Sequence, residues 1–235
     1  MPVALVIHGG GWINSDKSSL SPVSEVLARA GFAVFSINYR RLTEAPWPAC
    51  REDCQTAFQK LRSGELLDGY GVEPSRFVIA GASAGGHLAL MTALSQPAGQ
   101  VDASLVIAPP ASLEVNMATS DRFLFSAEFY EMFFGHAQPV TKEEMAAASP
   151  LSLVTEASPP LWLVHSRNDL LVPPEQSEKL VAAYRKNGRS VREYWFDGPD
   201  ADHGLWRDNA APVREMTPAF EAGLSAAVSG LCRAL

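Results

Sequence analysis

Cysteine is scarce in this sequence, and its spacing does not match a metal or redox site. Cys50 and Cys54 stand four residues apart in a segment with helical periodicity, and Cys232 lies near the end of the chain. An odd count without close pairs indicates neither zinc ligation nor a disulfide framework. We therefore expect no metal, free thiols in a reducing compartment and a cytoplasmic protein.

Long apolar runs and basic clusters are missing as well. No stretch approaches the roughly 20 apolar residues that cross a bilayer, and the apolar segment Met1 to Ile7 has no basic leader. The chain carries 19 Lys and Arg against 26 Asp and Glu, a formal net charge of −7. Such a charge argues against nucleic acid and anionic membranes as partners, because nothing basic clusters to replace phosphate counterions. The charge does not argue against a small-molecule substrate.

The composition is that of a globular chain. Of its 235 residues 47% are hydrophobic, and a single core of this size buries roughly 70% of the unfolded chain's surface. Neither an internal repeat nor a low-complexity linker interrupts the sequence. We therefore predict one domain over residues 1–235.

Short β-branched and aromatic runs alternate with longer stretches of helical periodicity. This alternation is typical of an α/β protein with a mostly parallel sheet and helices on both faces. The predicted strands are Val3–Ile7, Phe32–Asn38, Phe77–Ala80, Ser104–Ala108, Leu161–His165 and Val191–Phe196. The predicted helices are Pro22–Ala30, Cys50–Arg62, Gly85–Leu94, Glu175–Lys186 and Thr217–Leu231.

Residues 110–150 are too long for an ordinary connection between two strands. Six aromatic residues fall within twelve positions of this segment: Phe123, Phe125, Phe129, Tyr130, Phe133 and Phe134. They predict either a helix that packs into the core or a lid whose aromatic face lines an apolar pocket, and the two interpretations overlap. If the segment is a lid, we expect Phe129 and Phe133 to contact the substrate. We expect the same of Trp12, which follows three consecutive glycines.

The segment Gly81-Ala82-Ser83-Ala84-Gly85 stands between a predicted strand and a predicted helix. A Gly-x-Ser-x-Gly sequence in that context forms a sharp turn that exposes the serine at the carboxyl edge of the sheet. Ser83 is thus the candidate nucleophile. The amide of Ala84 follows it at a helix N-terminus, which favours negative charge.

A serine hydroxyl needs a base, and the base needs a partner that fixes its tautomer. His203 and Asp169 follow the last two predicted strands, so both lie at the sheet edge that carries Ser83. The order Ser, Asp, His is the one expected of this architecture. The acids closest to His203 in sequence, Asp197, Asp200 and Asp202, are poorly placed to reach its far ring nitrogen. His87, within a helix, and His165, within a strand, are predicted to be structural.

Acyl transfer also needs donors for an oxyanion. The run His8-Gly9-Gly10-Gly11-Trp12 follows the first strand, and bare glycine backbone lets amides approach a ligand closely. We predict that Gly10, Gly11 and Ala84 form the oxyanion hole.

At these residues the chain resembles the α/β-hydrolase superfamily, in particular the hormone-sensitive-lipase-like, feruloyl-esterase-like and kynurenine-formamidase-like enzymes. The resemblance includes His8–Trp12, Asn38–Arg40, Gly81–His87, Ser149–Leu151 and Asp202–Gly204. It implies a serine hydrolase with the triad Ser83, Asp169 and His203, no cofactor, and a small carboxylic ester as substrate. An amide or formamide, a thioester or a lactone remains an alternative, and a non-catalytic receptor is a minor one.

The resemblance is incomplete in three places. Ala82 replaces the aspartate usual in the lipase-like branch, Trp12 stands where that branch often has phenylalanine, and the two leading strands of the family's sheet are missing. Without those strands, Phe32–Asn38 becomes an apolar sheet edge, which is an aggregation hazard when left bare. We expect a partner subunit (a homodimer), the lid or the C-terminal helix to cover it.

Overall fold

The computed structural model describes residues 1–114, 126–137, 139–197, 202–203 and 216–235. Within these residues six strands form one sheet in the order β2-β1-β3-β4-β5-β6, and each neighbouring pair is parallel. The predicted strands are confirmed to within two residues. Their bounds are β1 Pro2–Ile7, β2 Ala33–Ile37, β3 Arg76–Ala82, β4 Ala103–Ile107, β5 Leu161–Ser166 and β6 Val191–Phe196.

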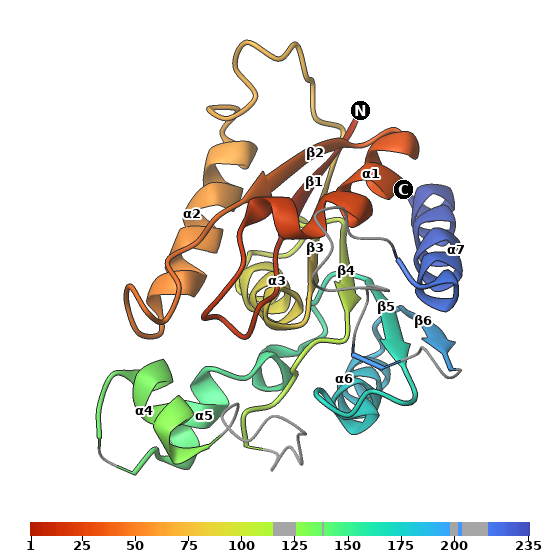
Figure 1. Cartoon of the computed structure of the whole chain (residues 1–235). Coiled ribbons are helices and arrows are strands. Elements are labelled where there is room, and N and C mark those ends of the chain that lie inside the picture. The colour runs from red at the N-terminus through yellow and green to blue at the C-terminus, as the bar shows by residue number, and fades with distance from the viewer. Residues whose placement is uncertain (115–125, 138, 198–201, 204–215) are drawn as a thin grey trace.

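Helices cover both faces of this sheet (Figure 1). Leu27 and Phe220 lie in the apolar cluster on one face, and Phe58, Leu88 and Tyr184 in the cluster on the other. Parallel strands need cover on both sides, which explains their continuous apolar runs. The helices are α1 Ser21–Arg29 and α7 Pro218–Ala234 on the first face, and α2 Ala49–Arg62, α3 Ala84–Leu94 and α6 Pro174–Lys186 on the second.

Two short helices lie in the predicted lid. α4 (Ala127–Phe134) begins at the side-chain cap Ser126, and α5 (Lys142–Ala147) begins at a capping box formed by Thr141 and Glu144. A 3-10 turn, η2 (Pro150–Leu153), leads back to the sheet. Residues 115–125, which include Phe123 and Phe125, and residue 138 lie outside the described residues.

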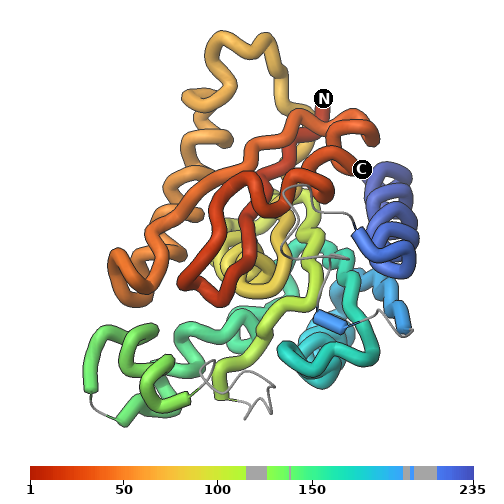
Figure 2. Tube along the Cα trace, in the orientation of Figure 1, coloured from red at the N-terminus to blue at the C-terminus, as the bar shows by residue number. Residues whose placement is uncertain are grey.

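The edge strand β2 differs from the strands inside the sheet, because its five residues are only half-buried. Figure 2 shows the C-terminal α7, in blue, beside the red N-terminal segment that carries α1. α7 packs chiefly on β6 and β5 and also contacts α1, so of the three predicted covers the C-terminal helix is the one that this packing does not favour. The ring of Tyr70 contacts Phe35 instead, with ring centroids 6.0 Å apart. A partner subunit on this edge stays a prediction.

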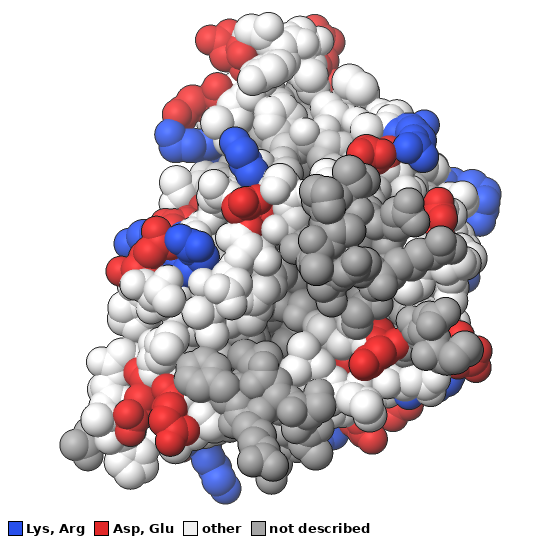
Figure 3. Space-filling model, viewed as in Figure 1, with Lys and Arg blue, Asp and Glu red and all other residues white. Residues whose placement is uncertain are grey.

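Charged side chains of both signs are interspersed on the face shown in Figure 3. Ion pairs in the described chain include Arg40 with Asp53 and Arg41 with Glu44. Among the described residues, no helix combines the length and apolar character that a membrane span requires.

Candidate active site

Ser83 occupies a strained turn between β3 and α3. Its backbone angles are φ 54° and ψ −126°, a region that residues other than glycine rarely adopt. The Ser83 amide donates to the carbonyl of Ile107 at 2.8 Å, and the Ser83 carbonyl accepts from the His87 amide at 3.0 Å. The turn is therefore held on both sides of the candidate nucleophile, by β4 and by the first turn of α3.

The two glycines of the motif are required by sterics. A Cβ on Gly81 would collide with the carbonyl of Gly85, and a Cβ on Gly85 would collide with the carbonyls of Ile7 and His8. These obstacles are backbone atoms, which cannot turn aside as a flexible side chain can. The motif thus lets the helix after Ser83 pack directly against the end of β1.

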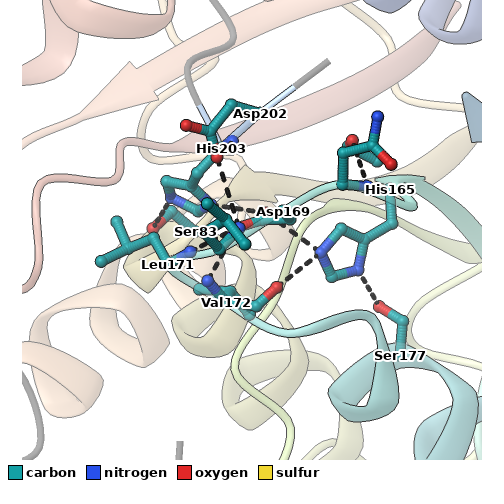
Figure 4. A network of polar contacts seen from close by, with 11 residues as sticks. Ser83, His165, Asp169, Leu171, Val172, Ser177, Asp202 and His203 are labelled. Carbon is teal, nitrogen blue, oxygen red and sulfur yellow. Dashed lines mark hydrogen bonds and ion pairs between the residues drawn. The ribbon is translucent and has the colours of Figure 1, made fainter. Parts of the chain in front are cut away.

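The structure brings Ser83, His203 and Asp169 together (Figure 4). Nε2 of His203 lies 2.9 Å from Oγ of Ser83, and Nδ1 lies 2.7 Å from Oδ2 of Asp169. The Ser83 and His203 positions are 120 residues apart in the chain. Because Asp169 can only accept at this contact when ionised, Nδ1 carries the proton and Nε2 is left to accept from the serine hydroxyl.

Asp169 is a buried carboxylate with a full set of donors. Oδ1 accepts from the amides of Leu171 at 2.9 Å and Val172 at 2.8 Å, while Oδ2 accepts from His203 and His165. Burial by itself would raise the pKa of Asp169, but the hydrogen bonds from His165 and His203 outweigh it and hold that pKa well below its usual range. The group therefore stays charged next to His203.

His165 touches the site, although its position within a strand led us to predict a structural role. It is the fifth of the six residues of β5, and its Nε2 lies 3.1 Å from Oδ2 of Asp169. The sequence does hint at this contact, because His165 lies near the end of a strand and Asp169 follows it by four residues. That spacing was not informative alone, because the path of the intervening turn decides whether they meet.

Asp202 connects the loops that carry the histidine and the acid. Its Oδ1 accepts from the amide of His203 at 2.6 Å and from that of Leu170 at 3.3 Å. Asp202 thus binds backbone instead of the far ring nitrogen of His203, in agreement with the choice of Asp169. The neighbouring Asp200 and Gly204 lie outside the described residues.

The glycine run lies against the serine turn. Gly10, Gly11 and Trp12 all have positive φ, at 104°, 62° and 60°, and a Cβ on Gly9 would lie 2.7 Å from the carbonyl oxygen of Ala82. Within the described chain, no backbone carbonyl accepts from the amides of Gly10, Gly11 or Ala84. These three amides stay the predicted oxyanion donors, and Ala84 is the first residue of helix α3.

Trp12, Phe129 and Phe133 form a buried aromatic cluster. None of them is more than 1% exposed, and the Trp12 ring lies 5.8 Å from that of Phe129 and 5.6 Å from that of Phe133. Such burial favours the packing interpretation over direct contact with substrate. The cluster anchors α4 on the glycine run.

No group of three or more His, Cys, Asp or Glu side chains able to hold a metal ion occurs in the part of the chain that the structure describes. The three cysteines are free thiols, two of them buried.

The parallel sheet, the Ser83 turn and the carboxyl-edge loops together define an α/β-hydrolase fold. More narrowly, the chain belongs to the BD-FAE family, whose family model matches residues 1–184.

Several of the similar proteins of known sequence or structure are named as esterases. Esterase LipQ of Mycobacterium tuberculosis is 32% identical over 223 residues, which are 91% of this chain and 52% of LipQ. This chain therefore spans about half the length of that relative. Carboxyl esterase 2 of the fungus Tuber melanosporum superimposes with a TM-score of 0.78 at 24% identity, covering all of this chain and 79% of the other. Esterase 2 of Thermogutta terrifontis, phosphonylated by sarin, superimposes with a TM-score of 0.76 at 22% identity. The match covers 99% of this chain and 83% of the other.

Proposed function

We propose that this chain is a serine esterase that cleaves a small carboxylic ester through an acyl-enzyme intermediate. The observation that carries the proposal is the continuous line of contacts from Ser83 Oγ through His203 to Asp169, at 2.9 and 2.7 Å. The esterases among its relatives and the BD-FAE family support the same reaction.

In the first half of the reaction, Ser83 Oγ attacks the ester carbonyl carbon while its proton passes to Nε2 of His203. The carbonyl oxygen becomes an oxyanion, and the amides of Gly10, Gly11 and Ala84 are the groups we propose to hold it. Collapse of this intermediate breaks the bond to the alcohol oxygen, which takes the proton from Nε2. The acyl group remains on Oγ.

In the second half, a water molecule gives its proton to Nε2 and attacks the acyl carbon. The bond to Ser83 Oγ then breaks, Oγ recovers the proton and the carboxylic acid leaves. Asp169 stays ionised throughout and stabilises the imidazolium that forms in both halves.

Replacement of Ser83 tests the proposal. Ser83→Ala is expected to abolish turnover of p-nitrophenyl acetate and labelling by a fluorophosphonate probe, with unfolding by urea unchanged. The matched control is Ser95→Ala at the other end of α3, whose hydroxyl bonds the carbonyl of Met91; its activity should equal that of the native chain. Turnover that survives in Ser83→Ala would refute the proposal.

The alternative substrates share the chemistry at the carbonyl, so rates on a panel distinguish them. An ester, a formamide, a thioester and a lactone of matched size are compared with the Ser83→Ala background subtracted. The ester is expected to have the highest kcat/KM. A native chain that binds these compounds without turnover and resists the probe would point to the non-catalytic receptor instead.

We also infer a cytoplasmic location. Cys50, Cys54 and Cys232 are all unpaired, and free thiols persist best in a reducing compartment. Fractionation of cells that carry the gene tests this, and recovery of the chain from the culture medium would contradict it.

A further inference from the structure

A second imidazole contacts the carboxylate of Asp169 from the side opposite His203. Nε2 of His165 lies 3.1 Å from Oδ2, the same oxygen that accepts from Nδ1 of His203 at 2.7 Å. Figure 4 shows Asp169 between the two histidine rings. His165 is completely buried, and the reaction steps proposed above do not use it.

The partners of His165 determine where its proton lies. Nε2 faces two acceptors, Oδ2 of Asp169 and the carbonyl oxygen of Val172 at 3.0 Å, so Nε2 carries a hydrogen. Nδ1 lies 2.6 Å from Oγ of Ser177, whose hydroxyl can donate to it. With a hydrogen on Nε2 and Nδ1 accepting from Ser177, the ring is held in one tautomer by the hydrogen bond at its other nitrogen.

Packing holds this ring in place. It stacks on Trp195 of β6 with an interplanar angle of 10° and a centroid distance of 5.7 Å. Three elements therefore surround it: β5 carries the ring, β6 supplies Trp195 and α6 supplies Ser177. Two charged groups contact Trp195, namely the guanidinium of Arg167 above its ring and Glu193 at its indole N–H.

A carboxylate has about four acceptor positions, and at Asp169 four donors fill them. The two backbone amides bind Oδ1, and the two imidazoles bind Oδ2. Removing the His165 donor leaves His203 alone on Oδ2. The carboxylate then holds the proton that it shares with His203 more tightly, because less of its charge is neutralised elsewhere.

We propose that His165 is a positioning residue for the esterase reaction. It keeps the Asp169 carboxylate turned toward His203. By donating to Oδ2 it also makes the carboxylate less basic, so that His203 releases its proton more readily. This role rests on the proposed function, because it acts only through a catalytic His203. Ser177 supports it by fixing the tautomer.

The test is the pH dependence of kcat/KM for p-nitrophenyl acetate in three variants. His165→Leu removes the donor, and its acid limb is expected to move to higher pH by about 0.5 to 1, with a roughly tenfold lower kcat. His165→Gln offers an amide N–H near the position of Nε2 and should return the limb toward that of the native chain. Ser177→Ala, which releases the tautomer, should show a smaller shift in the same direction.

The control is His136→Gln, at a histidine that contacts Glu144 in the lid, and its profile should equal that of the native chain. A merely structural role for His165 would lower the active fraction without moving the acid limb. An unmoved limb in His165→Leu or, should that variant not fold, in Ser177→Ala overturns the inference. Activity that survives Ser83→Ala refutes the proposed function instead, so the two failures are distinct.

Discussion

The indole N–H of Trp12 donates to Nδ1 of His87 across 3.3 Å and joins the glycine run to the helix behind Ser83. Nε2 of the same imidazole lies 2.7 Å from the carbonyl oxygen of Ala148, at the base of the lid. A carbonyl can only accept, so Nε2 carries the proton and Nδ1 accepts from Trp12. One buried, neutral ring therefore connects the proposed oxyanion loop, α3 and the end of the lid.

We predict that Trp12→Phe lowers kcat about tenfold with little change in KM, because loss of this hydrogen bond lets the amides of Gly10 and Gly11 move away from the oxyanion. Steady-state kinetics on p-nitrophenyl acetate measure it. Trp162→Phe is the matched control, since Nε1 of Trp162 is buried without a hydrogen-bond partner among the described residues. A Trp12→Phe variant with native kcat would contradict the prediction.

The lowered pKa of His87 predicts that the protein is less stable in acid. Burial lowers its pKa from the ordinary 6.5 to about 4, so between these values the unfolded chain takes up a proton that the folded chain refuses. The contribution of His87 to the free energy of unfolding is therefore fully present only above pH 6.5. It should fall on the order of 3 kcal/mol as the pH drops to 4. Urea unfolding from pH 7.5 to 4 measures this.

His87→Gln separates this contribution from other groups. Burial also lowers the pKa of His8, which acts in the same direction, but His8 is common to both proteins. The variant cannot take up a proton at position 87, so its unfolding free energy should fall less over this range. Parallel curves for the two proteins would show that His87 is not the cause.

Gly85→Ala should destabilise the fold by about 3 kcal/mol or more, because the added Cβ meets two backbone carbonyls. Gly223→Ala in α7 is the control, since its nearest neighbour is 3.5 Å away. That change should stabilise the chain by up to about 1 kcal/mol through helix propensity. Urea unfolding compares the free energies of unfolding of the two variants. Equal values would mean that close packing of α3 on β1 is not what requires a glycine at position 85.

Asp202→Ala should lower kcat roughly tenfold, since the backbone of His203 loses the acceptor that holds it to the Asp169 loop and a small displacement is costly in catalysis. Asp202→Asn retains an acceptor oxygen and should keep most of the activity. Initial rates at saturating ester provide the comparison. An alanine variant as active as the asparagine variant would mean that this contact does not position His203.

Much of the fold was predictable because its signals are local. Strands such as Val3–Ile7 are apolar throughout, and the glycines around Ser83 mark a turn whatever surrounds it. The prediction that Ser83, Asp169 and His203 meet followed from one further rule, that loops after parallel strands open on the same edge. These inferences need only neighbouring residues and the direction of the strands.

Other relationships depend on contacts that no local pattern encodes. The approach of His165 to Asp169, the use of Asp202 as a backbone acceptor and the burial of Phe129 and Phe133 all follow from loop paths and from which faces pack together. Periodicity says that a side chain is apolar or a turn is tight. Only three-dimensional packing decides which distant atom it meets, because contact distances depend on sheet order and on the combined volume of side chains from several elements.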